Sequence, residues 1–227
     1  MSKVRQIFKF QLWNYLYLII LLITGFFIAE KQYDFFVGKF LGISTVLWLI
    51  IAVSLAVLHQ LYVQLIWRIE LVTAYFTKKF GIKKSYRMFG VGFFILFISR
   101  LLVILVVAWS NRYTLRTPPW VNYIASAFVL YFVFYAFYSV VKYFTFHRAL
   151  GIDHFDRSYA EPFETRGIYK YTNNGMYVYA MLIVYLPGLL LFSKAALLLG
   201  LFNQLYAWGH YFSVERPDMK VIYGKTP

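Results

Sequence analysis

Long apolar runs separated by short charged segments limit what this chain can fold into. A helix needs roughly 20 apolar residues to cross the hydrocarbon core of a bilayer. Four runs approach or exceed this length, at positions 12–29, 40–67, 88–108 and 121–143. Two further runs, 176–192 and 195–214, are separated by two residues, which permits only a tight helical hairpin. We therefore expect an all-α integral membrane protein of about six transmembrane helices, the fifth bent at Pro187 and Gly188.

The composition and the distribution of charge agree with a multi-pass membrane protein. Of 227 residues, 61% are hydrophobic and only 14% charged, too few for the polar shell of a soluble domain. The net charge of +14 would suit a nucleic-acid-binding domain, but the cations lie between the apolar runs. With the N-terminus inside, 17 of the 23 Lys and Arg residues fall in inner segments. The positive-inside rule then places both termini in the cytoplasm, most simply at the cell (inner) membrane.

The first apolar run follows Lys3, Arg5 and Lys9 and resembles a secretory signal, but no A-x-A-like cleavage site follows it. We interpret it as a retained anchor. The chain has no cysteine, which excludes disulfides, thiolate metal sites and a cysteine nucleophile. Without repeats or long flexible linkers, residues 1–227 form a single domain whose largest polar part is the loop 144–175.

Polar residues in the second apolar run cannot all face lipid. The positions of Gln60, Gln64 and Arg68 repeat every four residues, and His59 and Glu70 lie on a neighbouring stripe. One interpretation is hydrogen bonding between helices, with Arg68 and Glu70 paired at the interface. The other is that His59, Gln60, Gln64 and Arg68 line a cavity that binds the substrate.

The third and last apolar runs also carry polar side chains. Arg100 lies inside the third run, where it serves either an interior pair or a substrate phosphate. In the last run a helical period predicts two adjacent polar stripes. They comprise Gln204, Trp208, Tyr211 and Glu215 on one side, and Asn203, Tyr206 and His210 on the other.

The polar loop holds a third group of ionisable residues, Asp153, His154 and Asp156. His and Asp can ligate zinc or manganese, but the chain offers no further ligands at a fixed spacing. We therefore expect no metal and an otherwise solvated loop.

The segment 166–224 resembles the C-terminal signature of the phospholipid N-methyltransferase family, to which isoprenylcysteine carboxyl methyltransferases are related. That family shows a G-x-Y-x-x-x-R-H-P-x-Y pattern, a tight helical hairpin and a closing helix with a glutamate. Gly167, Tyr169 and Tyr177 match the pattern, and Glu215 lies in the glutamate region. The resemblance covers about a quarter of the chain. Asn-Asn-Gly replaces Arg-His-Pro at 173–175, as in the phosphatidylethanolamine methyltransferase-like variants, and Asn offers only neutral hydrogen bonds.

The resemblance implies that a region at about 144–224 binds S-adenosylmethionine on the cytoplasmic side, without a Rossmann fold. The residues that it assigns to the cofactor are Tyr169, Asn173, Asn174, Gly175, Tyr177, His210, Glu215 and Asp218. Methyl transfer to an amine needs a group that accepts its proton. Our candidates for this catalytic role are Asp153, His154, Asp156 and Glu70.

The function predicted is methylation of an amine-bearing membrane lipid, such as phosphatidylethanolamine, at the cytoplasmic leaflet. Three alternatives remain open. The acceptor could be an oxygen or carboxyl group on a prenylated or other apolar substrate. The chain could instead be a small transporter or lipid-binding scaffold, or a reductase similar to the NADPH-dependent membrane sterol reductases.

Overall fold

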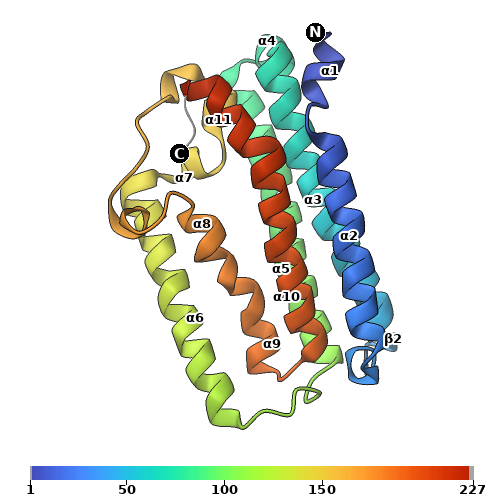
Figure 1. Ribbon diagram of the computed structural model, residues 1–227. Coiled ribbons are helices and arrows are strands. Elements are labelled where there is room, and N and C mark those ends of the chain that lie inside the picture. Colours follow the sequence, from blue (N-terminus) through green and yellow to red (C-terminus); the bar gives the residue numbers. More distant parts are fainter. Residues whose placement is uncertain (1, 225–227) are drawn as a thin grey trace.

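Helices make up almost all of the regular structure in the computed structural model, which describes residues 2–224 (Figure 1). Four of them are long and apolar enough to cross a membrane. They are α2 (Gln11–Glu30), α3 (Thr45–Thr73), α5 (Ile82–Ser110) and α6 (Pro119–Ser139), the last continued by the π-helical turn η2 (Val140–Phe144). The structure thus confirms an all-α membrane protein with four candidate spans.

Two predicted helix boundaries differ from the observed ones. The second apolar run begins at Phe40, but residues 39–44 form a small hairpin of β1 (Lys39–Phe40) and β2 (Ile43–Ser44). The α3 helix starts after it, where the Ser44 hydroxyl accepts a hydrogen bond from Leu47 N, an ordinary N-cap. It continues to Thr73, past the predicted end, and stops where Ala74 adopts a left-handed conformation.

The fifth apolar run is not one continuous α-helix. It is divided into α8 (Gly175–Val178), the 3₁₀ segment η6 (Ala180–Tyr185) and α9 (Leu186–Leu190). Pro187 does not bend a longer helix as predicted, because it occupies the first turn of α9, where its missing N–H has no helical partner to lose. The tight link to α10 (Lys194–His210) is present, and a Cβ on Gly188 would lie 2.9 Å from Leu197 N.

Short elements gather at the end of the bundle where residues 144–175 lie, here called the loop end (Figure 1). These are α1 (Lys3–Ile7), α4 (Tyr75–Phe80), α7 (Phe146–Ala149), η3 (Ile152–His154), η4 (Arg157–Tyr159), η5 (Gly167–Lys170), the π-helical turn η7 (Tyr211–Glu215) and α11 (Arg216–Tyr223). The opposite, far end carries η1 (Tyr33–Phe35) and the remaining connections. The first and last described helices therefore lie at the same end.

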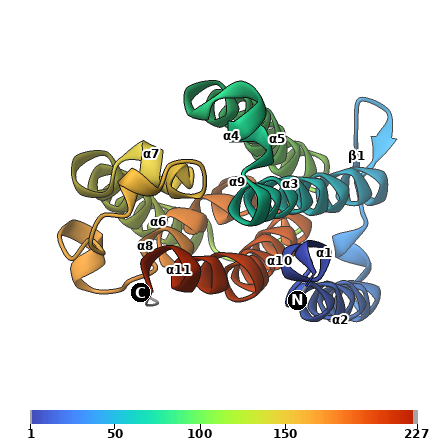
Figure 2. The same cartoon turned by 90° about the horizontal axis from the view of Figure 1, so that it is seen from above.

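Close packing of small residues joins α3, α5 and α10 in the centre of the bundle. Ala52, Val107, Ala108, Ala195 and Ala196 are all almost completely buried in this core. Small side chains let helix backbones approach closely, as is common between membrane helices. Viewed from above, α6 and α7 lie apart from α5, with α9 between them (Figure 2). Side chains from α3, α5, α6 and α10 line a cavity that extends to residues of the loop end such as Phe146 and Arg148.

At the far end, one buried amide joins three connections. Asn111 Nδ2 donates to the carbonyl oxygens of Asp34 and Val37 at 2.8 and 2.9 Å. Its Oδ1 accepts from Ser193 Oγ and Ala195 N, both at 3.0 Å. The side chain thereby holds the start of α10 against the end of α5, which orients the helices that line the space.

Candidate functional site

A cavity of about 320 Å³ lies between α3, α5, α6, α10 and the polar loop. Its lining is largely apolar, with aromatic rings such as Phe93, Phe97 and Phe137, and its polar side chains come both from the helices and from the loop end. An apolar chamber with a few convergent polar groups is typical of a ligand site. We call it the central cavity.

One end of the central cavity carries a buried guanidinium. Arg100 is 7% exposed and lines the cavity. Its Nε donates to Asn203 Oδ1, and Nη2 lies 3.4 Å from the Asn203 carbonyl oxygen. Nη1 is 3.5 Å from His59 Nδ1. Of the two roles predicted for Arg100, the interior pair is present, although its partners are neutral side chains and no carboxylate of the described chain forms an ion pair with it.

Two buried histidines face the same space with nitrogens that have no hydrogen-bond partner within the described chain. They are Nε2 of His59 and both ring nitrogens of His210. His210 packs 5.9 Å from the ring of Trp67. Buried polar atoms normally find a partner, so these nitrogens are available to a ligand.

The loop end of the cavity is acidic and rests on a buried network. The His154 ring lies between two carboxylates, with Nδ1 3.0 Å from Asp153 Oδ1 and Nε2 3.4 Å from Asp218 Oδ2. Asp218 in turn pairs with Arg68 at 2.9 Å, and Tyr223 donates to Asp153 at 2.7 Å. The network therefore fastens η3 to α3 and α11.

The electrostatics of this network hold a proton on His154. Burial by itself lowers the pKa of His154, but hydrogen bonds to Asp153 and Asp218 raise it to about 9. Burial likewise opposes the change at Asp153, where the hydrogen bond with His154 lowers the pKa. At neutral pH the ring is therefore an imidazolium between two carboxylates, which leaves no free nitrogen to accept a proton.

The four predicted catalytic residues do not come together. Asp153 lines the central cavity, whereas His154 is enclosed by the network. Asp156 accepts hydrogen bonds from Ser158 at the start of η4, on the surface of the loop. Glu70 accepts from Phe76 N and Thr77 N and so caps α4. Of the four, only Asp153 is placed where it meets a ligand in the cavity.

Seven of the eight residues that the family resemblance assigns to the cofactor lie around the central cavity. These are Tyr169, Asn173, Asn174, Gly175, Tyr177, His210 and Glu215. The Tyr177 hydroxyl donates to Glu215, which joins α8 to the end of η7. Gly175 allows a close approach, because a Cβ there would lie 2.6 Å from Ile168 Cγ2. The eighth, Asp218, instead pairs with Arg68 and His154.

The predicted substrate-binding stripe on α3 divides into two parts. His59 and Gln60 line the cavity. Gln64 is directed elsewhere and donates to the Tyr15 hydroxyl at 3.1 Å. The predicted pairing of Arg68 with Glu70 is wrong, because Arg68 reaches Asp218 and the carbonyl oxygen of Ser213.

Several cavity residues were not predicted. Arg148, Glu164 and Tyr223 line it from the loop and from α11. Hydrogen bonds from Arg166 lower the pKa of Glu164 to about 2, so this carboxylate is ionised. Glu164 lies in an irregular loop, Arg148 in the four-residue helix α7 and Tyr223 at the end of α11. All three lie outside the apolar runs, so the helical period of those runs gave no signal for them.

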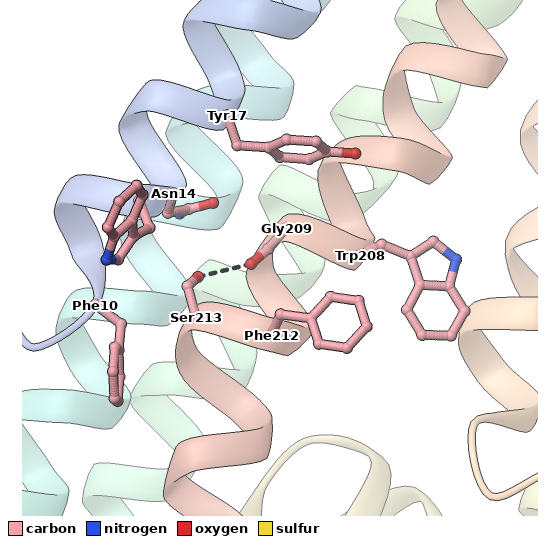
Figure 3. A pocket seen from close by; sticks show the side chains of 8 residues that line it. Phe10, Asn14, Tyr17, Trp208, Gly209, Phe212 and Ser213 are labelled. Carbon is pink, nitrogen blue, oxygen red and sulfur yellow. Dashed lines mark hydrogen bonds between the residues drawn. The ribbon is translucent and has the colours of Figure 1, made fainter.

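A second hollow of about 380 Å³ lies on the outside of the bundle, between α2 and α10 (Figure 3). We call it the outer groove. Its lining residues are Phe10, Trp13, Asn14, Tyr17, Trp208, Gly209, Phe212 and Ser213. None of the residues predicted to bind cofactor or substrate lines it.

Within residues 2–224, no group of three or more His, Asp or Glu side chains is arranged to hold a metal ion. Comparison with known proteins adds no relative: no family model, curated protein or solved structure matches the chain.

Proposed function

We propose that the chain is a membrane-embedded methyltransferase that uses S-adenosylmethionine and acts on an amine-bearing lipid. One observation carries the proposal. Seven residues that the family resemblance assigns to the cofactor come from two segments that are separated in sequence, yet they line one cavity: Tyr169, Asn173, Asn174, Gly175, Tyr177, His210 and Glu215. The Tyr177–Glu215 hydrogen bond joins the two segments directly.

In this proposal six segments cross the membrane, with the hairpin of residues 175–210 as the last two. Both termini and the polar loop are cytoplasmic. Two features support this orientation: α1 and α11 lie at the same end of the bundle (Figure 1), and 17 of the 23 Lys and Arg residues fall in segments assigned to the inner side. The acidic end of the central cavity then faces the cytosol, where S-adenosylmethionine is dissolved.

The residues at that end suit a cationic cofactor. S-adenosylmethionine supplies an electrophilic methyl group on a sulfonium. The carboxylate of Asp153 favours a positive charge beside it. Burial raises the pKa of Glu215 to about 7, and a cation beside this group favours its ionised form. Asn173 and Asn174 offer neutral donors and acceptors in place of the Arg and His of the related family.

The chemistry requires alignment, exclusion of water and one proton acceptor. The amine nitrogen uses its lone pair to form a bond to the methyl carbon while the carbon–sulfur bond breaks. The electron pair of the broken bond stays on sulfur. The amine proton must leave, and His154 cannot take it because it is already protonated. Asp153 and the ring nitrogens of His210 line the cavity and are our candidates for this step.

The proposal is tested by calorimetric binding of S-adenosylhomocysteine to the purified protein in detergent. We expect binding to the wild type, weaker binding to Asn174→Ala and Glu215→Ala, and unchanged binding to Asp156→Asn, a matched control on the loop surface. A wild type that is folded but binds nothing overturns the proposal and favours a transporter or a reductase.

The acceptor is identified by transfer of labelled methyl groups in vesicles. Methylation of phosphatidylethanolamine, but not of phosphatidylglycerol, supports an amine acceptor. If only a prenylated carboxylate is methylated, the chain is a methyltransferase but its acceptor is not a lipid amine.

A further inference from the structure

The outer groove contains a buried polar side chain that the fold does not satisfy. Asn14 is 2% exposed, and neither its amide nitrogen nor its amide oxygen has a hydrogen-bond partner within residues 2–224. In Figure 3 this amide points from α2 towards Gly209 on α10, within the groove. An unpaired amide inside a membrane-spanning helix is costly, so its persistence points to a ligand that supplies the partner.

The rest of the groove suits a hydrocarbon chain. Phe10, Trp13, Tyr17, Trp208 and Phe212 form its walls. Gly209 lets Tyr17 and Asn14 of α2 lie close to α10 at the floor of the groove, because a Cβ there would lie 2.7 Å from the Tyr17 ring and 3.1 Å from Asn14 Oδ1. Its volume of about 380 Å³ falls within the range of ordinary ligand sites. Tyr and Trp are also the residues that favour the level of lipid headgroups.

Two cations stand beside the loop end of the groove. Lys9 Nζ lies 5.0 Å from the centre of the Phe10 ring, and the Arg216 guanidinium lies 5.9 Å from that of Phe212. Both rings line the groove, and both cations are exposed. No acidic residue lines the groove. A negatively charged group above the apolar walls would therefore meet two positive charges.

We propose that the outer groove binds one anionic phospholipid. Its acyl chain lies along the aromatic walls, an ester group pairs with the amide of Asn14, and the phosphate contacts Lys9 and Arg216. This site is separate from the central cavity and does not depend on the proposed enzymatic function. A bound lipid would also join α2, which packs mainly against α10, to the rest of the bundle.

Tryptophan fluorescence provides the test, because Trp13 and Trp208 both line the groove. The full chain, delipidated in detergent, is titrated with dibrominated phosphatidylglycerol and with dibrominated phosphatidylcholine. We expect quenching that saturates near one lipid per chain and at least tenfold tighter binding of phosphatidylglycerol. The same titration of a Trp13→Phe/Trp208→Phe variant should lose most of the saturable quenching.

Charge variants distinguish a loss of lipid binding from a folding defect, because the side chains that are changed are exposed. Lys9→Gln/Arg216→Gln should abolish the preference for phosphatidylglycerol, whereas Lys83→Gln/Lys84→Gln, also exposed at the loop end, should retain it. Asn14→Leu should weaken both lipids equally. Quenching that never saturates and is equal for both lipids would mean ordinary bilayer contact and overturn the proposal. Cross-linking of two chains through position 13 in lipid-free detergent would also overturn it, since a second copy would then fill the groove.

Discussion

The protonated His154 makes the stability of the loop end depend on pH. Burial disfavours the charge, but hydrogen bonds to Asp153 and Asp218 raise the pKa from 6.5 to about 9. The folded state therefore binds the proton more tightly than the unfolded state, so the contribution is complete below pH 6.5 and is lost as the pH rises through about 9. That difference corresponds to about 3 kcal/mol of unfolding free energy.

The perturbation that isolates this effect is His154→Gln, which keeps hydrogen-bonding capacity but cannot carry the proton. Thermal unfolding in detergent between pH 6 and pH 9.5 would measure it. We expect the melting temperature of the wild type to fall roughly 5–10 °C more than that of the variant across this range. At pH 6 the variant should be less stable, because Asp153 loses the charge beside it and Asp218 keeps only that of Arg68. Lys and Tyr groups titrate in both proteins and cancel in the difference. Parallel curves for the two proteins would refute a protonated His154.

Three further predictions concern other parts of the fold. Asn111→Ala removes the side chain to which five groups at the far end are hydrogen-bonded and should lower the unfolding free energy by about 3 kcal/mol or more, measured by denaturant titration against Asn173→Ala, a change at an exposed position. Gly151→Ala should destabilise the loop by about 1–3 kcal/mol, because φ is +66° and a Cβ would lie 2.5 Å from the Trp67 ring; limited proteolysis of the loop, faster than in the wild type, would report this. Arg100→Met removes a buried cation without a counter-ion and should change the unfolding free energy by less than about 1 kcal/mol, while methyl transfer falls at least tenfold; a large loss of stability with full activity would show a purely structural role.

The sequence predicted the helices better than their ends. Long runs of apolar side chains predict the helices α2, α3, α5 and α6, since a helix forms all of its backbone hydrogen bonds within itself when it lies in hydrocarbon. Local contacts decide where a helix starts or stops, as with the Ser44 cap of α3. The broken path through 175–190 was not predictable from apolar composition, because that composition is the same for an α-helix and for the 3₁₀ segment η6.

The candidate site was predictable only where residues lie on regular helices or match a motif. His59 and Gln60 on α3 reach the central cavity, as their polarity inside an apolar run indicates. Arg68 lies on the same stripe but close to the loop end, where Asp218 of α11 pairs with it. A contact between residues so distant in sequence depends on how the helices pack, and no spacing along the chain reports it.

The stripe predicted on the closing helix through Gln204, Trp208, Tyr211 and Glu215 lies along one side of that helix in the structure, where all four residues contact Tyr177. A period of 3.6 residues places Trp208 and Glu215 on one face. In the structure residues 211–215 form the π-helical turn η7, and Glu215 at its end still reaches Tyr177. The Trp208 ring packs 5.5 Å from the Tyr177 ring and also lines the outer groove. The second such turn, η2, ends α6 beside the same cavity through Val140 and Phe144. Both departures from α-helical geometry thus occur beside the central cavity, which agrees with the frequent occurrence of π-helical turns at functional sites.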